Sequence, residues 1–403
     1  MTGPVVVIGG GLAGAKTVEA LRDKGFDGSL TLVCAEDVLP YERPPLSKDY
    51  LLGKAGLLDS TVHDEQWYAD RRVDVRLGVS AVALDPAQRV VTLSDGTSLD
   101  YSSCVLATGS EPVGLDDLPP GVAVALRTAA DAEALKAQLA EGGRWVIAGG
   151  GWIGLEVAAA ARAAGCEVTV VLSSARPLQS AIGPVAAEVF LELHLAHGVR
   201  FRPEHRVTDA VVTDGRLRAV LLEDGEELPA DRLLVAVGAR PRLDLAVAAG
   251  LEVGDGVRVG PDLRTSDPHI WAVGDIAEVN HPVLGRPVRV EHWAWALHQP
   301  AVAAASILGQ DAAFDDLPYF FSDQYDLGME FLGDPHPDDR LVLRGDRDGR
   351  EFVGFLCGAD DVVHAVIAVN VWDVPDAVRD LIIDGRPVDP ARLADEQVPL
   401  AEL

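Results

Sequence analysis

The stretch "VVVIGGGLAGAKTVEALRDKG" (Val5–Gly25) recurs in kind as "WVIAGGGWIGLEVAAAARAAG" (Trp145–Gly165). Each copy begins with a short apolar run, passes through a G-x-G-x-x-G motif into an alanine-rich helical pattern, and ends at a glycine. A second apolar run follows each copy, "SLTLVCAE" (29–36) in the first and "CEVTVVLSS" (166–174) in the second. The repeat therefore predicts two strand–helix–strand units in one chain.

The glycine spacing predicts what these units bind. In such a motif the first glycine makes a tight strand-to-helix turn, the second lets the backbone approach a pyrophosphate, and the third lets helix and strand pack closely. The phosphates then lie at a helix N-terminus, where N–H groups and the helix dipole favour negative charge. We therefore expect two nucleotide sites, at Gly9, Gly11 and Gly14 in the first copy and at Gly149, Gly151 and Gly154 in the second.

Length and composition limit the class of protein. At 403 residues the chain is expected to form two or three domains, and 48% apolar residues are enough to fill their cores. The 63 acidic and 34 basic side chains give a formal charge of -29. Such a field repels phosphate backbones and anionic lipid, so we expect neither nucleic acid nor a membrane as a partner.

Targeting and cysteine signals are sparse. The N-terminal residues have neither a basic region nor a long apolar run, so we expect no signal peptide or membrane span and a cytoplasmic location. The four cysteines are isolated in the sequence, which argues against a redox dithiol and against a metal site. Each is interpreted as a small buried hydrophobic residue.

Breaks in the pattern predict three domains of an α/β chain. A first Rossmann-like nucleotide domain is expected over residues 1–110 and 235–313. A second is inserted over 111–234, after the loop "SEPVGLDDLPPG". A C-terminal α+β domain covers 314–403, with strands at "RLVLRGD", "EFVGFLCG" and "VVHAVIAV" and a helix near "DVPDAVRDLIIDG".

Further motifs carry a family resemblance over nearly the whole chain. They are "LPYERPPLSKDYLLG" (39–53), "LATGS" (106–110), "AVGDIA" (272–277), "VEHWAWALHQ" (290–299) and "PYFFSDQYD" (318–326). With the glycine motifs, the sequence resembles the FAD-dependent ferredoxin reductases that serve P450s and dioxygenases, in the pyridine nucleotide-disulfide oxidoreductase superfamily. The resemblance implies a glutathione reductase-like fold, one noncovalent FAD, NAD(P)H as electron donor, a small iron–sulfur ferredoxin as acceptor, and a monomer or homodimer.

The resemblance also implies residue roles. Lys48 should lie near the flavin N5, and Glu156 should meet both the nicotinamide and that lysine. An ammonium group beside N5 would stabilise the negative charge that arrives with hydride, and a carboxylate would hold the ammonium in place. The full set of candidate cofactor-binding residues is Gly9, Gly11, Leu12, Ala13, Gly14, Glu36, Arg43, Lys48, Ala107, Thr108, Gly109, Arg127, Gly149, Gly151, Ile153, Gly154, Glu156, Leu172, Ser173, Ser174, Arg176, Gly238, Gly274, Asp275, Glu291, His292 and Trp293.

Four positions depart from the family pattern. Ala35 stands where an acid usually holds the FAD ribose, which leaves Glu36 as the expected substitute. Leu172 stands where the matching acid for the nicotinamide nucleotide belongs. Phe321 replaces a tryptophan, and Pro300 replaces a glycine.

The missing acid at Leu172 bears on the choice of nucleotide. A carboxylate there would bond the ribose and repel a 2′-phosphate. Without it, the hydroxyls of Ser173 and Ser174 could bond either group, and Arg176 could pair with a 2′-phosphate. We therefore expect relaxed selectivity with a slight preference for NADPH.

Electrons are expected to leave through a face formed by Trp293, Phe321 and the start of the C-terminal domain, with Arg289 as a docking charge for an acidic ferredoxin. Two alternatives stay open: an NAD(P)H oxidase, peroxidase or quinone reductase, and a redox-gated binding protein resembling apoptosis-inducing factor. The isolated cysteines argue against a disulfide reductase.

Overall fold

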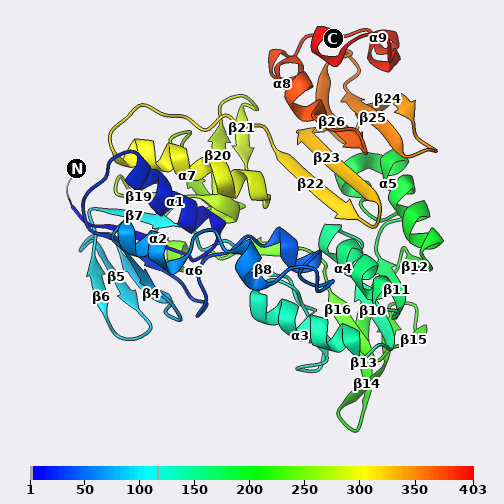
Figure 1. Cartoon of the computed structure of the whole chain (residues 1–403), viewed down its shortest axis with the longest axis horizontal. Coiled ribbons are helices and arrows are strands. Elements are labelled where there is room, and N and C mark those ends of the chain that lie inside the picture. The colour runs from blue at the N-terminus through cyan, green and yellow to red at the C-terminus, as the bar shows by residue number, and fades with distance from the viewer. Residues whose placement is uncertain (1–2, 116–117) are drawn as a thin grey trace. The chain divides into compact units, whose positions relative to one another are not determined.

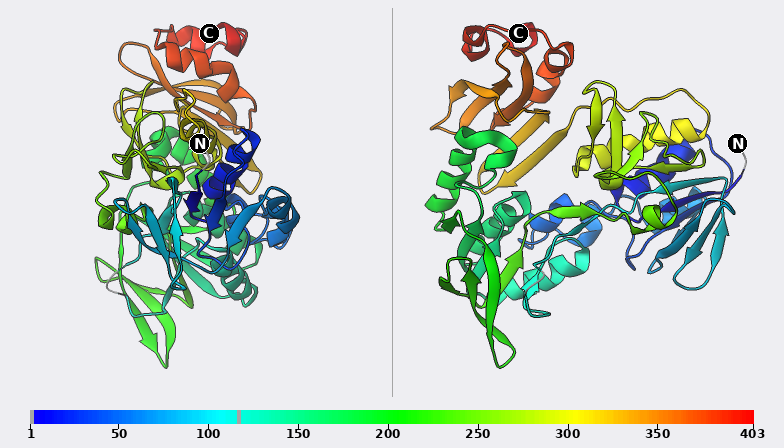
Figure 2. Two further views of the ribbon diagram at one scale, coloured as in Figure 1. Left: turned by 90° about the vertical axis from the view of Figure 1, so that its left-hand side faces the viewer. Right: turned by 180° about the vertical axis from the view of Figure 1, so that it is seen from behind.

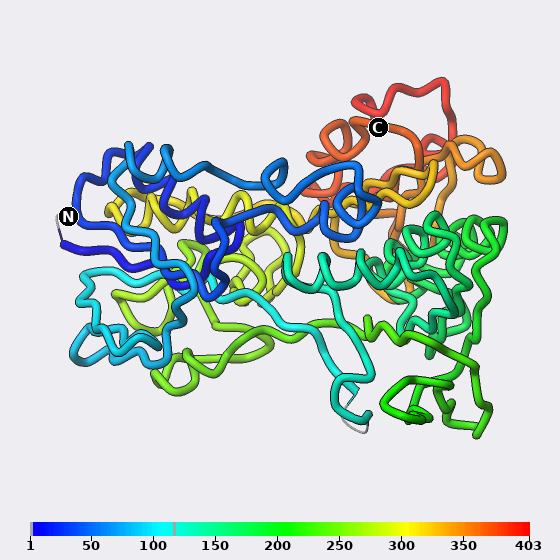
Figure 3. The backbone as a smooth tube through the Cα atoms, turned by 60° about the horizontal axis from the view of Figure 1, so that its bottom comes forward, coloured from blue at the N-terminus to red at the C-terminus, as the bar shows by residue number. Residues whose placement is uncertain are grey.

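The computed structural model describes residues 3–115 and 118–403 (Figure 1). Residues 1–2, of the expected first domain, and 116–117, in the loop expected to open the second, lie outside the described residues. The chain forms two compact units. Unit 1 comprises Met1–Arg43, Leu57–Glu111 and Arg240–Tyr319, and unit 2 comprises Pro44–Gly56, Pro112–Ala239 and Phe320–Leu403. Figure 3 follows the chain through these segments.

Unit 1 is built on a parallel five-stranded sheet of order β19-β7-β1-β2-β3. Its registers bring the carboxyl ends of β1, β2, β7 and β19 to one edge, which is where ligands bind in sheets of this kind. Helices α1 and α7 pack against each other in this unit, and the buried apolar strands form its core. The sheet strands are β1 (Val5–Ile8), β2 (Leu30–Val33), β3 (Val73–Arg76), β7 (Ser103–Leu106) and β19 (Ile270–Ala272), and the helices are α1 (Leu12–Asp23), α2 (Glu65–Asp70), α6 (Asp244–Ala248) and α7 (Trp293–Ile307).

Smaller elements complete unit 1. Two three-stranded sheets are formed by β4 (Ala81–Asp85), β5 (Val90–Leu93) and β6 (Ser98–Asp100), and by β18 (Val257–Val259), β20 (Ala277–His281) and β21 (Arg286–Val288). The short turns η2 (Leu57–Ser60) and η3 (Gly274–Ile276) also belong here. β8 (Ser110–Pro112) and β17 (Ala239–Pro241) lie where the chain passes between units.

Unit 2 repeats the parallel design and adds an antiparallel sheet. Its parallel sheet has the order β12-β11-β10-β16-β9, and its antiparallel sheet the order β22-β23-β26-β25-β24, drawn from yellow-orange to orange in Figure 2. The parallel part comprises β9 (Ala123–Val124), β10 (Arg144–Ala148), β11 (Glu167–Leu172), β12 (Arg200–Pro203) and β16 (Arg232–Val235), with helices α3 (Ala129–Ala140), α4 (Trp152–Ala163) and α5 (Gln179–Ala196) and the hairpin sheet β13 (Val207–Thr213), β14 (Arg216–Leu222) and β15 (Glu227–Pro229).

The C-terminal sheet packs on the helices of unit 2. One apolar core joins Leu155 of α4 and Phe190 of α5 to Phe331 of β23 and Phe352 of β25. The C-terminal elements are β22 (Tyr319–Gln324), β23 (Leu327–Gly333), β24 (Arg340–Asp346), β25 (Glu351–Cys357), β26 (Val363–Val369), α8 (Val374–Asp384), α9 (Pro390–Ala394) and η4 (Leu400–Glu402), and η1 (Pro44–Ser47) also belongs to unit 2.

Both expected strand–helix–strand units are present, as β1–α1–β2 and β10–α4–β11, and so are the expected C-terminal strands and helix. The compact units group the residues differently from the three expected domains, because unit 2 holds most of residues 111–234 together with residues 320–403. The three-domain division stays a prediction. Across residues 3–115 and 118–403, none of the helices combines the length and the apolar character that a membrane crossing requires.

Candidate functional site

The first glycine turn, between β1 and α1, is fixed by packing at two glycines and open at the third. A Cβ on Gly9, which has φ +131°, would lie 2.0 Å from the carbonyl oxygen of Ala107, and a Cβ on Gly14 would lie 1.9 Å from that of Gly9. A Cβ on Gly11 would meet none of the described atoms within 4 Å. Gly11 is the N-cap residue of α1 and has no side chain to cap the helix. This opening at a helix N-terminus fits an approaching pyrophosphate.

The second turn, between β10 and α4, repeats that geometry. Gly149 has φ +111°, and a Cβ there would lie 2.1 Å from the carbonyl oxygen of Ala236. A Cβ on Gly154 would lie 2.3 Å from the carbonyl oxygen of Gly149. A Cβ on Gly151 would again meet none of the described atoms within 4 Å. Gly151 is the N-cap residue of α4. Both turns therefore have the shape that a dinucleotide needs.

Polar side chains surround the end of β2. The carboxylate of Glu36 accepts a hydrogen bond of 2.7 Å from the hydroxyl of Tyr41 and one of 3.2 Å from Arg43. These contacts hold the carboxylate of Glu36 in place. Glu36 stands two residues after Cys34 and so lies beyond the carboxyl edge of the sheet. The segment that departs from the family at Ala35 thus still presents a carboxylate.

The end of β11 is apolar. Leu172 is 3% exposed, and a Cβ on Gly150 would lie 3.3 Å from its Cβ. Ser173 is exposed, the hydroxyl of Ser174 donates to the backbone oxygen of Arg176 at 2.6 Å, and Arg176 is paired with Glu188 of α5. A 2′-phosphate would therefore have to compete with Glu188 for the guanidinium, and the role of Arg176 stays a prediction.

Further candidates in unit 1 follow the same sheet edge. Ala107, Thr108 and Gly109 come after β7, and Gly274 and Asp275 come after β19. The backbone N–H of Gly274 donates to the buried side chain of Gln299 at 2.6 Å. The edge therefore gathers four of the expected FAD-binding segments.

At the start of α7, the indole N–H of Trp293 donates to Glu42 at 3.0 Å. The N-cap residue of α7, His292, is half-buried, and desolvation lowers the pKa of its imidazole to about 4 although the charge of Asp275 opposes the shift. His292 is therefore neutral at pH 7.

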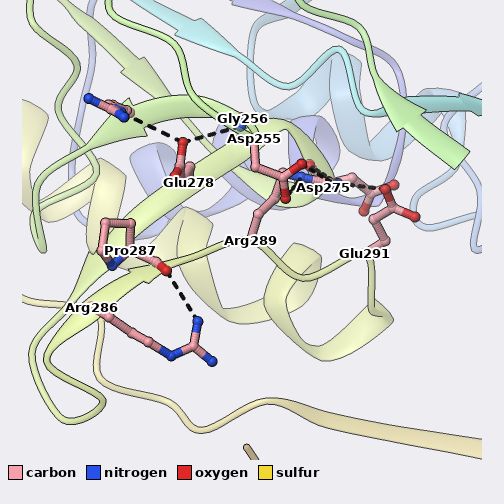
Figure 4. A network of polar contacts seen from close by, with 9 residues as sticks. Asp255, Gly256, Asp275, Glu278, Arg286, Pro287, Arg289 and Glu291 are labelled. Carbon is pink, nitrogen blue, oxygen red and sulfur yellow. Dashed lines mark hydrogen bonds and ion pairs between the residues drawn. The ribbon is translucent and has the colours of Figure 1, made fainter. Parts of the chain in front are cut away.

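Arg289 forms the centre of a polar network beside these segments (Figure 4). Its guanidinium lies 2.9 Å from Asp255 and 2.5 Å from Glu291, and it donates to the backbone oxygen of Asp275 at 3.3 Å. The side chain is only 11% exposed. The prediction of Arg289 as a docking charge is therefore wrong, because two carboxylates surround it and it faces inward.

Lys48 and Glu156 form a buried ion pair in unit 2. The ammonium nitrogen lies 3.0 Å from Oε1 of Glu156, and the side chains are 17% and 7% exposed. Lys48 follows the short turn η1, and Glu156 lies in the second turn of α4, directly after the second glycine motif. The ammonium also lies 5.4 Å from the ring centroid of Phe321. The structure thus brings together the two residues expected to act in hydride transfer.

Two serines that the sequence interpretation missed hold Glu156 in place. The hydroxyl of Ser322 donates to Oε1 at 2.7 Å, and that of Ser47 donates to Oε2. A buried carboxylate is costly unless its oxygens are bonded, and here three donors converge on it. Their positions in the sequence could have indicated this role. Ser47 in "PPLSK" stands next to Lys48, and Ser322 in "FFSDQ" stands next to Phe321.

The Ser322 contact continues into the interior. Gln324 donates to Ser322 at 3.1 Å and contacts the ring of His194 in α5 at 2.8 Å. Burial lowers the pKa of His194 to about 4. This chain of contacts connects the C-terminal sheet with the carboxylate of Glu156.

Other candidates are less clustered. Arg127 precedes α3 in unit 2, and its backbone N–H donates to Asp131 at 3.1 Å, while Asp275, Glu291 and Trp293 belong to unit 1. Gly238 has φ +123° and follows β16. The roles of the candidate residues stay predictions.

Comparison with known proteins gives a consistent result. Residues 3–300 match the family described as "Pyridine nucleotide-disulphide oxidoreductase", and residues 319–403 match "Reductase C-terminal". The chain is 42% identical over 401 residues to the ferredoxin–NAD(+) reductase component of the anthranilate 1,2-dioxygenase system of Burkholderia cepacia, covering 98% of each chain. It is 37% identical to putidaredoxin reductase of Pseudomonas putida, covering 99% of this chain and 96% of the other.

Among solved structures, the covalent complex of putidaredoxin reductase with putidaredoxin matches with a TM-score of 0.94 and 37% identity, over 99% of this chain and 97% of that one. A ferredoxin reductase from Rhodopseudomonas palustris matches with a TM-score of 0.94 and 33% identity, over 98% of each chain.

Proposed function

This chain belongs to the pyridine nucleotide-disulphide oxidoreductase family, and from that premise we propose that it is an NAD(P)H-dependent ferredoxin reductase. It would take electrons from NAD(P)H and deliver them singly to a small iron–sulfur ferredoxin that serves a P450 or a dioxygenase. The relatives named as ferredoxin reductases cover nearly the whole chain, C-terminal domain included, which supports this partner over others.

FAD is the cofactor, and when bound it accepts a pair of electrons as hydride and releases them one at a time. The open turn at Gly11 and the carboxylate of Glu36 fit its pyrophosphate and ribose, and the segments at Gly109 and Asp275 lie at the same sheet edge. The equivalent turn at Gly151 would hold the pyrophosphate of NAD(P)H.

The observation that carries the proposal is the buried pair of Lys48 and Glu156. Lys48 supplies a positive charge that Glu156 holds at 3.0 Å. Because Ser47 and Ser322 bond the two carboxylate oxygens, they orient Glu156 and with it the ammonium group that it pairs with. Preorganised charge of this kind stabilises a transition state without reorganisation at the moment of reaction.

The thiols disfavour the peroxidase and disulfide-reductase alternatives. All four cysteines are buried and free. Burial raises the pKa of Cys34 to about 12 and that of Cys357 to about 11, and it also raises the pKa of Cys104 and Cys166. A thiol that stays protonated is a poor nucleophile toward peroxide or disulfide. Free thiols and a need for NAD(P)H are compatible with the cytoplasm, where we place the reaction.

The test is stopped-flow reduction of the FAD-loaded protein, with Lys48→Ala compared with wild type. We expect the variant to retain FAD and to be reduced about 100- to 1000-fold more slowly. Lys54→Ala is the matched control, because Lys54 lies in the same segment, is 67% exposed and contacts only Asp49 among the partners described for it.

Ferredoxin-dependent reduction of cytochrome c identifies the acceptor. Putidaredoxin should raise the rate, and the rate should change with ionic strength because salt screens the charges on both proteins. Cytochrome c reduction that does not depend on ferredoxin, at a rate equal to the rate of oxygen consumption, would favour the oxidase alternative.

In the stopped-flow experiment, equal rates of flavin reduction in wild type and Lys48→Ala would contradict the role of the ion pair. A protein that binds no flavin would overturn the whole proposal.

A further inference from the structure

Two histidines and an aspartate converge in the C-terminal sheet, away in sequence from every cofactor motif. His336 and Asp339 lie between β23 and β24, and His364 is the second residue of β26. One ligand atom from each of the three lies within 4.8 Å of the other two. The sequence predicted no metal site, because its four cysteines form no pair with metal-ligand spacing.

The carboxylate of Asp339 is the fixed part of this cluster. Its side chain is 3% exposed. Both oxygens face Nδ1 of His364, at 2.9 and 3.0 Å, and Oδ2 also accepts from the backbone N–H of His336 at 2.8 Å. A carboxylate buried to this extent needs a positive partner, because burial of an uncompensated charge is strongly unfavourable.

The two imidazoles are the adjustable part. The ring centroids of His336 and His364 lie 4.3 Å apart at an angle of 43°. His336 is exposed, whereas the side chain of His364 is 22% exposed. A simple His364–Asp339 ion pair accounts for the first contact but leaves a second imidazole beside the first. Two imidazoles placed side by side next to one carboxylate can share one cation.

The distances suit a small ion. Two ligand atoms about 2.1 Å from a tetrahedral zinc ion lie about 3.4 Å apart. The Asp339–His364 contacts, at 2.9 and 3.0 Å, lie within about 0.5 Å of this tetrahedral separation, and the exposed His336 can rotate to add a third ligand. Imidazole with carboxylate favours first-row transition metals such as zinc and nickel, whereas magnesium and calcium prefer oxygen ligands alone.

We propose that His336, Asp339 and His364 form a binding site for one divalent transition-metal ion, with Zn²⁺ as the expected ligand and water completing its coordination. Such an ion would link the β23–β24 loop to β26 and so stabilise the C-terminal sheet. The site is independent of the flavin chemistry proposed above, and its occupancy should not require FAD or NAD(P)H.

The test is isothermal titration of the full-length, tag-free, FAD-loaded protein with ZnCl₂, together with thermal unfolding in the presence of Zn²⁺ and then of EDTA. We expect saturable binding of one ion per chain and a rise in melting temperature that EDTA reverses. His336→Ala and Asp339→Asn should each weaken binding by at least about 10- to 100-fold, the loss that is usual even for a group that only supports a ligand of the metal.

Matched controls come from other histidine–aspartate pairs. His298 lies 2.8 Å from Asp316 and His205 lies 3.1 Å from Asp224, and each is a single histidine beside a carboxylate. His298→Ala and His205→Ala should leave the Zn²⁺ affinity unchanged. His336 is the safest variant for folding, because its side chain is exposed. Absence of saturable binding, or equal loss of affinity in the controls, would overturn the proposal.

Discussion

The two glycine-motif units share their backbone and differ at the end of the second strand. In β1–α1–β2 the chain continues from the strand to Glu36, which Tyr41 and Arg43 hold by hydrogen bonds. In β10–α4–β11 the strand ends on Leu172, which is buried, and Arg176 is occupied by Glu188. The glycines are expected to receive a pyrophosphate in both units, and the end of the second strand is expected to decide how firmly the adjoining ribose is held. The first unit therefore suits a cofactor that stays bound, and the second unit suits a nucleotide that must dissociate.

The largest effect should come from the glycines that have no room for a side chain. Gly9→Ala would place a Cβ 2.0 Å from the oxygen of Ala107, and Gly149→Ala would place one 2.1 Å from that of Ala236. We expect Gly9→Ala to be purified without FAD. Gly149→Ala should retain FAD but lose measurable reduction by NAD(P)H. Flavin absorbance and stopped-flow reduction separate the two outcomes.

The open glycines provide a control that does not depend on folding. Alanine at Gly11 or Gly151 meets no described atom within 4 Å, so both variants should fold with unchanged circular dichroism. Each should nevertheless weaken its own nucleotide, because the added methyl group points into the space reserved for the pyrophosphate. If Gly11→Ala weakened NAD(P)H and spared FAD, the assignment of the two units would be reversed.

The next effect should come from Glu36. Glu36→Gln keeps the shape of the side chain but removes the charge, and so removes charge-assisted hydrogen bonds worth about 1.5 to 3 kcal/mol. We expect FAD affinity to fall by about 10- to 100-fold, measured by fluorescence titration of the apoprotein. Asp74→Asn is the control, since Asp74 also pairs with an arginine, Arg76, at the exposed surface of unit 1. Unchanged FAD affinity in Glu36→Gln would show that Glu36 does not replace the acid missing at position 35.

These contrasts indicate what sequence alone can predict. The glycine turns and the apolar strands of the C-terminal sheet are local patterns, so their structures could be read directly. The serine contacts to Glu156 join η1, α4 and β22, and the cluster at His336, Asp339 and His364 joins a loop to β26. Neither follows from local spacing, because both depend on tertiary packing. Arg289 was misjudged partly for the same reason, since Asp255 becomes its neighbour only in the fold, whereas Glu291 stands two residues away in the sequence.

A smaller effect concerns pH, because desolvation disfavours the charged form of two histidines. Burial lowers the pKa of His292 in unit 1 and of His194 in unit 2 to about 4. An unfolded histidine titrates near 6.5, so between pH 6.5 and pH 4 the unfolded chain binds more protons than the folded one. Stability is therefore full above this window and falls as the pH falls through it, by about 2 kcal/mol per histidine between pH 7.5 and pH 5.

Urea unfolding at pH 7.5 and pH 5 measures this loss. His194→Gln can still bond Gln324 but cannot gain a proton, so it should lose about half as much stability as the wild type over the same interval. An identical pH dependence in both proteins would mean that His194 titrates normally in the folded state.

The smallest effect should come from the strand end of the second unit. Leu172 offers no carboxylate to repel a 2′-phosphate, and Arg176 is paired with Glu188 instead of being available to attract one. Both arguments together predict weak discrimination, with kcat/KM for NADPH and NADH within about tenfold and only a slight preference for NADPH. Leu172→Glu should restore repulsion of the 2′-phosphate and lower kcat/KM for NADPH relative to NADH by about tenfold.

Because a new charge at a buried position can disturb β11, Ser173→Asp serves as a second variant, with the acid one residue further on, where the side chain is exposed. Arg176→Ala should change the ratio little, since the guanidinium is already committed. If the wild type strongly prefers NADH, and if neither Leu172→Glu nor Ser173→Asp alters the ratio of the two kcat/KM values, then the end of β11 does not read the ribose. The contrast with Glu36 would then have no bearing on nucleotide selectivity.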